Sequence, residues 1–211
     1  MEFKEIKNII FDLGGVIINL DMDRTARAFA EFTGKSLKEV QDRIATLNIF
    51  YKYEVGELND QEFRNLVREF IGSEITDQQI DQSWNALLLD IPKERIELIK
   101  NLGKQFRIFI LSNTNLIHFV EVEKILEKHT GVSSLSAMFE KVYLSYEMGM
   151  CKPHPGIYQY VLKNADLKAS ETLFIDDNLN NIEGASQLGI KTIHLQPPTT
   201  ILDIFDGAKF S

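Results

Sequence analysis

Acidic side chains stand directly after two apolar segments of the chain. Asp12 follows the run Ile6–Phe11, and the adjacent Asp176 and Asp177 follow the run Thr172–Ile175. Adjacent carboxylates repel each other unless a cation or a hydrogen-bond donor lies between them, so the pair indicates a site that holds positive charge. Three oxygen ligands with open positions suit Mg²⁺, which prefers a few carboxylates completed by water and a phosphate group.

Two further polar segments follow apolar runs. Ser112 and Asn113 offer a hydroxyl, an amide and backbone N–H groups at the start of a predicted helix, where a phosphate oxygen can bind. Lys152 lies in the stretch CKPHP, where proline restricts the backbone and would hold a cation in a fixed place. Each segment also fits an ordinary role, because Ser and Asn begin many helices and a lysine beside proline is usually solvated.

Helix capping is the simpler interpretation of the acidic residues. Asp12 could cap the turn that follows it, and Asp176 and Asp177 could cap the next helix, for which Asn178 competes. Capping accounts for one residue of this group but not for all of them. We also expect His154 to hydrogen-bond locally.

The distribution of apolar residues predicts the elements that position these groups. Strands are predicted at Ile6–Phe11, Arg107–Leu111, Val142–Leu144, Thr172–Ile175 and Lys191–Leu195. Amphipathic segments such as Leu116–Lys128 and Pro155–Leu162 separate the last four strands. This alternation predicts an α/β fold with a doubly wound, Rossmann-like parallel sheet covered on both faces. The carboxyl ends of parallel strands share one edge, so the acidic residues are expected to meet there.

Residues 21–90 lack a convincing strand and carry helix-start signals, for example Ser36 followed three residues later by Glu39. We expect this segment to be an inserted helical cap domain over the carboxyl edge of the sheet. The remaining residues, 1–20 and 91–211, are expected to form the catalytic core.

Composition excludes several classes of protein. The chain has 211 residues, of which 44% are hydrophobic, and its 31 acidic against 23 basic residues give a net charge of −8. This balance argues against nucleic-acid binding and against a polybasic membrane surface. The N-terminus lacks the layout of a signal peptide, and no apolar run approaches the roughly 20 residues of a membrane span. The single cysteine, Cys151, is expected to pack as a small side chain, and a cytoplasmic protein is expected.

The polar residues, in chain order, resemble the four motifs of the haloacid dehalogenase superfamily, and the inserted segment resembles the helical cap of its first cap class. The motif residues are Asp12, Ser112, Lys152 and the pair Asp176 and Asp177. Longer strings resemble bacterial sugar-phosphate phosphatases of the kind that hydrolyse α-glucose 1-phosphate. These strings are FDLGGVIINLD, YEVGELNDQEF, LSNTN, YLSYEMGMCKPHPGIYQYVL and FIDDNLNNIEGASQLGI.

The resemblance implies a Mg²⁺-dependent phosphatase that acts on a small phosphorylated metabolite. Asp12 would attack phosphorus and form an aspartyl-phosphate intermediate. Asp12 and Asp177 would bind Mg²⁺ directly, Asp176 directly or through water, and Gly14 through its backbone carbonyl.

The same resemblance implies how the substrate is held. Ser112 and Asn113 would bind the phosphoryl group, and Lys152 would balance the charge of nucleophile and phosphate. No oligomeric state is implied.

Gly14 departs from the family pattern, which usually has an aspartate two residues after the nucleophile as general acid and base. Loss of such a group typically costs about 10²- to 10⁴-fold in rate. The loss is least harmful for a sugar 1-phosphate, because an anomeric oxygen leaves more readily than an ordinary alkoxide. Asp21, Glu54 or Glu57 could supply the proton if the cap folds over the site.

Three other functions remain open from the sequence. A metal-independent 2-haloacid dehalogenase would also use Asp12, but the intact pair Asp176 and Asp177 counts against it. A sugar phosphomutase normally relies on the missing acid. A catalytically weak member of the fold that binds a metabolite or a partner protein would tolerate Gly14.

Overall fold

The computed structural model describes residues 5–45, 48–71 and 74–206. Its strands are β1 (Asn8–Phe11), β2 (Arg107–Ser112), β3 (Lys141–Leu144), β4 (Thr172–Asp176) and β5 (Lys191–His194). They form one sheet in the order β3-β2-β1-β4-β5, and every neighbouring pair is parallel. The predicted doubly wound parallel sheet is therefore confirmed. The direction of winding changes between β1 and β4, where sheets of this type leave a crevice for ligands.

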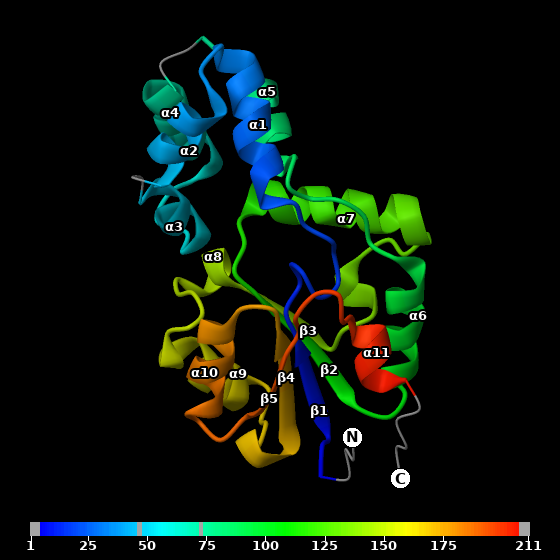
Figure 1. Cartoon of the computed structure of the whole chain (residues 1–211). Coiled ribbons are helices and arrows are strands. Elements are labelled where there is room, and N and C mark those ends of the chain that lie inside the picture. The colour runs from blue at the N-terminus through cyan, green and yellow to red at the C-terminus, as the bar shows by residue number, and fades with distance from the viewer. Residues whose placement is uncertain (1–4, 46–47, 72–73, 207–211) are drawn as a thin grey trace.

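Helices cover both faces of the sheet (Figure 1). One face carries α6 (Lys93–Leu102), α7 (Leu116–Thr130) and α11 (Ile201–Phe205), and the other carries α9 (Pro155–Asn164) and α10 (Leu179–Ser186). A short helix, α8 (Ser145–Met148), follows β3, and two 3-10 helices span Leu135–Ala137 and Ala169–Glu171. No helix of the described part of the chain is long and apolar enough to cross a membrane.

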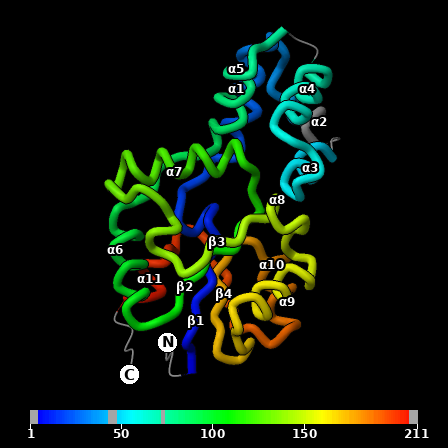
Figure 2. The backbone as a smooth tube through the Cα atoms, turned by 180° about the vertical axis from the view of Figure 1, so that it is seen from behind, coloured from blue at the N-terminus to red at the C-terminus, as the bar shows by residue number. Residues whose placement is uncertain are grey.

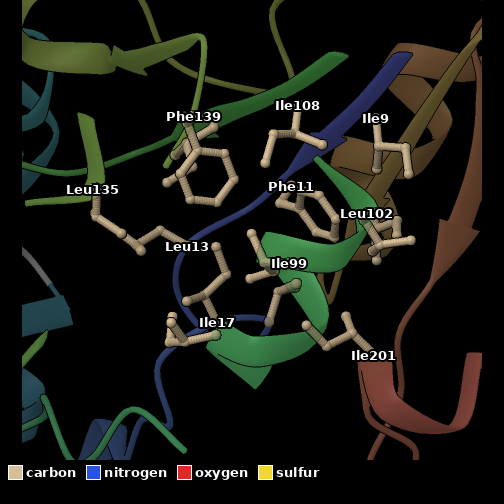
Figure 3. Close-up of a cluster of buried hydrophobic side chains, with 14 of the residues drawn as sticks. Ile9, Phe11, Leu13, Ile17, Ile99, Leu102, Ile108, Leu135, Phe139 and Ile201 are labelled. Carbon is tan, nitrogen blue, oxygen red and sulfur yellow. The ribbon is translucent and has the colours of Figure 1, made fainter. Parts of the chain in front are cut away.

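The apolar side chains of the central strands explain why the strands appear in the sequence as continuous hydrophobic runs. Ile9 and Phe11 pack against Ile99 and Leu102 of α6 (Figure 3), whereas Ile10 belongs to the cluster on the opposite face. Burial on both faces is typical of parallel sheets. The core therefore holds the ends of β1, β2 and β4 in fixed positions.

The helices between β1 and α6 lie beyond the carboxyl edge of the sheet (Figures 1 and 2). They are α1 (Met22–Thr33), α2 (Leu37–Ala45), α3 (Ile49–Glu54), α4 (Asp60–Ile71) and α5 (Asp77–Asn85), and we call them the cap helices. Phe63 and Ile80 are buried in a hydrophobic cluster of the cap helices that also includes Ile117 of α7. Ser36 and Glu39 form the expected reciprocal hydrogen bonds before α2. We propose residues 21–90 as the boundaries of a cap domain.

Candidate active site

Asp12 lies at the centre of the carboxyl edge of the sheet. Its backbone N–H donates to the Ile175 carbonyl at 2.8 Å, which extends the pairing of β1 with β4 by one residue. Its carboxylate oxygen Oδ1 accepts a hydrogen bond from the Leu13 N–H at 2.6 Å and lies 2.9 Å from the Lys152 ammonium. The other oxygen, Oδ2, accepts no hydrogen bond from the residues that the structure describes. One oxygen is thus fixed, and the other is available to a ligand.

Lys152 is buried, with 4% of its surface exposed, so it is not the solvated lysine that its sequence context also allowed. Its ammonium lies 2.7 Å from Asp176 Oδ2 and donates to the Leu111 carbonyl at 2.8 Å. Burial favours the neutral amine, but Asp12 and Asp176 outweigh it and raise the pKa of Lys152. The site therefore contains a permanent cation between β1, β2 and β4.

Asp176 is completely buried, and both oxygens of its carboxylate accept hydrogen bonds. Oδ1 accepts from the Asn178 N–H at 2.8 Å and from the Asn181 amide at 3.0 Å, and Oδ2 accepts from Asn181 and Lys152. These bonds fix Asp176 as the partner that positions the lysine.

Asp177 and Asn178 divide two roles that the sequence left open. Asn178 is the N-cap of α10 and accepts a hydrogen bond from the Asn180 N–H at 3.0 Å. The capping function therefore falls to Asn178, and Asp177 is not used for it. Likewise, His154 caps α9 by accepting a hydrogen bond from the Gly156 N–H, which is the local role expected for it, and Cys151 is buried as expected.

The three carboxylates fit a divalent cation. One oxygen each of Asp12, Asp176 and Asp177 lies within 4.8 Å of the others. Burial raises the pKa of Asp12 and of Asp177, and Asp176 raises both further. Lys152 opposes this effect but cannot neutralise three acids. A divalent cation would remove the excess charge, and an all-oxygen donor set suits Mg²⁺.

The side chain of Asn113 is engaged with the backbone of Lys152. Its side-chain amide donates to the Lys152 carbonyl at 2.9 Å and accepts from the Lys152 N–H at 2.9 Å. The side chain thus ties the loop after β2 to the loop after β3. A contact of Asn113 with phosphate, through its backbone N–H or the second amide N–H, beside the Ser112 hydroxyl at the end of β2, stays a prediction.

A cavity of about 410 Å³ lies between the carboxyl edge and the cap helices. The core contributes Leu13, Gly14, Ser112 and Asn113 to its lining, and the cap helices contribute residues that include Asp23, Phe50, Glu54 and Trp84. No lysine or arginine of the described residues lines it. The cavity therefore adjoins the segments that follow β1 and β2, and among the described residues it offers a ligand no lysine or arginine side chain.

Trp84 and His118 connect the cap helices to α7, and sequence reasoning assigned no role to His118. The Trp84 ring stacks on Phe50 at 4.7 Å and on His118 at 4.6 Å between centroids. Its indole N–H donates to Asn115 Oδ1 at 3.3 Å, and His118 Nε2 lies 3.1 Å from the Trp84 carbonyl. Burial lowers the pKa of His118 to about 4, so the ring is neutral at pH 7. The one signal in the sequence for a role of His118 was its position shortly after Ser112 and Asn113.

Comparison with known proteins agrees with this geometry. Residues 6–189 match the family of haloacid dehalogenase-like hydrolases. The chain is 33% identical over 188 residues to a D-ribitol-5-phosphate phosphatase of Bacteroides thetaiotaomicron, with 89% of this chain and 90% of the relative covered.

Two solved structures are also similar. A HAD family enzyme of Bacteroides thetaiotaomicron, in complex with magnesium and inorganic phosphate, has a TM-score of 0.87 and 37% identity, and 95% of this chain and 99% of that chain are covered. A predicted HAD-like family hydrolase of Porphyromonas gingivalis has a TM-score of 0.86 and 30% identity, with 96% and 97% covered.

Proposed function

The chain belongs to the haloacid dehalogenase-like hydrolase family and is a phosphatase with Mg²⁺ as its cofactor; within that class, we propose that it hydrolyses monophosphates of small, neutral sugars or sugar alcohols. One observation carries this proposal. Asp12 stands at the switch point of the sheet with Lys152 beside it and with Asp176 and Asp177 within reach of one shared ion. This set supplies a nucleophile, a fixed cation and a metal site on one edge.

The reaction we propose has two steps. Asp12 attacks phosphorus in line with the ester oxygen, the P–O ester bond breaks, and an aspartyl-phosphate forms. A water molecule then attacks phosphorus, which releases inorganic phosphate and restores the carboxylate. When bound to Asp12 and Asp177, Mg²⁺ supplies charge neutralisation between the nucleophile and the phosphoryl oxygens.

The other residues hold charge in place during these steps. Lys152 offsets the negative charge of the phosphoryl group, and Asp176 keeps the lysine charged and oriented through the 2.7 Å ion pair. The Ser112 hydroxyl binds a phosphoryl oxygen at the end of β2. The Asn113 side chain maintains the position of Lys152 through two hydrogen bonds with the Lys152 backbone.

The substrate class rests on the cavity and on the named relative. A cavity without lysine or arginine among the described residues gives no cationic partner to a second phosphate or to a carboxylate, so a neutral substrate body is favoured. Its volume, about 410 Å³, suits a small metabolite. The relative that is named for D-ribitol 5-phosphate supports a sugar alcohol, and the specific likeness to enzymes of α-glucose 1-phosphate stays a prediction.

A screen of phosphate esters tests this function. With Mg²⁺ present, wild-type protein should release phosphate from sugar and sugar-alcohol monophosphates faster than from bisphosphates or phosphorylated carboxylic acids. Asp12→Asn should release none above background. A preference for bisphosphates would contradict the substrate class, and undiminished activity of Asp12→Asn would contradict the assignment of the nucleophile.

The dehalogenase alternative is disfavoured by the same geometry. In a metal-independent reaction, no metal cation would compensate the charges that Asp12, Asp176 and Asp177 bring together. The raised pKa values of Asp12 and Asp177 show that this cluster disfavours their ionised forms. Release of halide from 2-haloacids without metal would support that alternative, and we expect none.

A further inference from the structure

Gly14 leaves the leaving-group oxygen without the usual proton donor, and the structure separates the three carboxyl groups that could replace it. Asp21 is engaged elsewhere: it caps α1, and its carboxylate accepts two hydrogen bonds from Arg27, at 2.9 and 3.1 Å. Glu57 is exposed and does not line the cavity. Glu54 is the remaining group of the three; Asp23 also lines the cavity, but it is exposed in the first turn of α1.

Glu54 ends α3 and lines the same cavity as Gly14 and Ser112. Its carboxylate makes no hydrogen bond or ion pair with the residues that the structure describes. A half-buried carboxyl group without a partner costs stability, and such groups are typical of functional sites. The side chain is therefore available to a substrate atom on the cavity side of the phosphoryl site.

The chain on both sides of Glu54 is fixed to the core. Tyr53 is buried, and its hydroxyl accepts from the Ile117 N–H of α7 at 3.4 Å while it donates to Asp60 at 2.6 Å. Gly56 has a φ of +73°, and a Cβ there would overlap the Tyr146 carbonyl of α8. Figure 1 shows α3 next to α8. These contacts hold the end of α3 against the carboxyl edge of the sheet.

The surroundings favour the protonated carboxyl. Burial raises the pKa of Glu54 to about 7, against a weaker opposing effect of Lys152. The other ionisable groups near it are Asp23 and the neutral His118, which line the cavity, and Cys151, a thiol whose pKa burial raises to about 11. A group that is protonated near neutral pH is suited to donate a proton and then to accept one.

We propose that Glu54 is the general acid and base of the phosphatase reaction, an inference that rests on the proposed function. As Asp12 attacks phosphorus, the Glu54 carboxyl donates its proton to the ester oxygen, and the alcohol leaves neutral. The Glu54 carboxylate then accepts a proton from the water that attacks the aspartyl-phosphate. Inorganic phosphate is released, and both residues return to their starting states.

Leaving-group dependence tests this role. We would measure single-turnover phosphorylation of Asp12 with two esters. The leaving group of p-nitrophenyl phosphate needs no proton from an acid, whereas the alkoxide of ribitol 5-phosphate does. Glu54→Gln should slow the reaction of ribitol 5-phosphate by about 10²- to 10⁴-fold and that of p-nitrophenyl phosphate by less than 10-fold. Glu57→Gln, which alters an exposed carboxylate of the same segment, is the matched control and should change neither rate.

A second variant restores the acid at the other position. At Gly14 the backbone is outside the left-handed region, and an added Cβ would meet only the end of the Leu20 side chain at 2.8 Å. Gly14→Asp in the Glu54→Gln background should therefore recover at least 10-fold of the lost rate with ribitol 5-phosphate. The wild-type rate with this ester should also fall as pH rises through about 7, and this fall should disappear in Glu54→Gln.

Two results would overturn the assignment of Glu54: an unchanged rate of Glu54→Gln with ribitol 5-phosphate, or an equal loss with both esters. Failure of the proposed function is distinguishable, because it would appear as wild-type hydrolysis of p-nitrophenyl phosphate that needs neither Mg²⁺ nor Asp12. If Glu54→Gln fails to fold, the pH profile of the wild-type protein is the test. The same pH dependence of the phosphorylation rate with both esters would contradict the role of Glu54 as general acid.

Discussion

Gly15 and Asp177 touch so closely that a Cβ atom on Gly15 would overlap the carboxylate oxygen Oδ2 of Asp177. Gly15 also has a φ of +69°, in the region that favours glycine. The loop after β1 thus rests directly on the acidic residue that follows β4. Of the two glycines near Asp12, Gly15 is required by geometry, whereas a Cβ at Gly14 would meet only the end of the Leu20 side chain, which can move.

Gly15→Ala should therefore weaken Mg²⁺ binding, because the new methyl group displaces the Asp177 carboxylate from its place beside Asp12. We expect a 10- to 100-fold higher Mg²⁺ concentration for half-maximal activity, about the effect of disturbing groups that orient metal ligands. Gly131→Ala is the matched control, since Gly131 has a φ of +72° with nothing within 4 Å of its Cβ position. Equal Mg²⁺ dependence in both variants would show that the contact has no role.

Lys152→Met should abolish most turnover, with a loss of roughly 10²-fold or more, because the cation that offsets the phosphoryl charge is removed. The geometry adds a cost in stability, because two buried carboxylates, Asp12 and Asp176, lose their partner. Chemical denaturation should show a loss of about 3 kcal/mol, and Lys152→Met/Asp176→Asn should recover part of it without recovering activity. Recovery of activity in the double variant would refute the catalytic role of the lysine.

Asn113→Ala should lower kcat by about 10-fold or more while the fold is retained. The substitution removes both 2.9 Å hydrogen bonds that hold the Lys152 backbone, so the ammonium loses its fixed position. Asn113→Asp keeps only the acceptor for the Lys152 N–H and should lie between wild type and alanine. Steady-state kinetics with a saturating ester would measure this order, and full activity of Asn113→Ala would show that the positioning is unnecessary.

His118 should make the protein less stable in acid. Burial lowers its pKa to about 4, so between pH 6.5 and pH 4 the unfolded chain binds a proton that the folded chain does not. Stability from this group is complete above pH 6.5 and is lost as pH falls toward 4, by as much as about 3 kcal/mol. Denaturation at pH 7 and pH 4.5 should show a smaller difference for His118→Gln than for wild type. His129→Gln, at an exposed position of the same helix, should behave like wild type.

The sheet and its edge could be predicted from the sequence because they depend on local patterns. Runs such as Arg107–Leu111 and Thr172–Ile175 are apolar and bounded by polar residues, and the strands β2 and β4 begin at the same residues and end one residue later. A parallel sheet then brings Asp12 and Asp176 to one edge without further information. The order of the motifs along the chain therefore sufficed to place the acids.

Contacts between distant segments account for what the sequence could not provide. Burial of Lys152 depends on its ion pairs with two other strand ends, and no local pattern distinguishes it from a surface lysine. Glu54 and Glu57 lie three residues apart, yet Glu54 lines the cavity and Glu57 is exposed. The close approach of Gly56 to the backbone of α8 between them joins distant parts of the chain and has no local signal. The amide of Asn113 likewise finds its partner 39 residues away.

Direct detection of a phosphorylated Asp12 tests the proposed reaction at its first covalent step. Protein mixed with a sugar-alcohol monophosphate and Mg²⁺ would be quenched in acid within one turnover and digested, and the peptide containing Asp12 would be analysed by mass spectrometry. We predict the added mass of one phosphoryl group on Asp12, lost on treatment with hydroxylamine and absent when Mg²⁺ is chelated or in Asp12→Asn. Release of phosphate at the wild-type rate with no phosphoryl group on Asp12 at any quench time, or with Asp12→Asn still active, would contradict the mechanism.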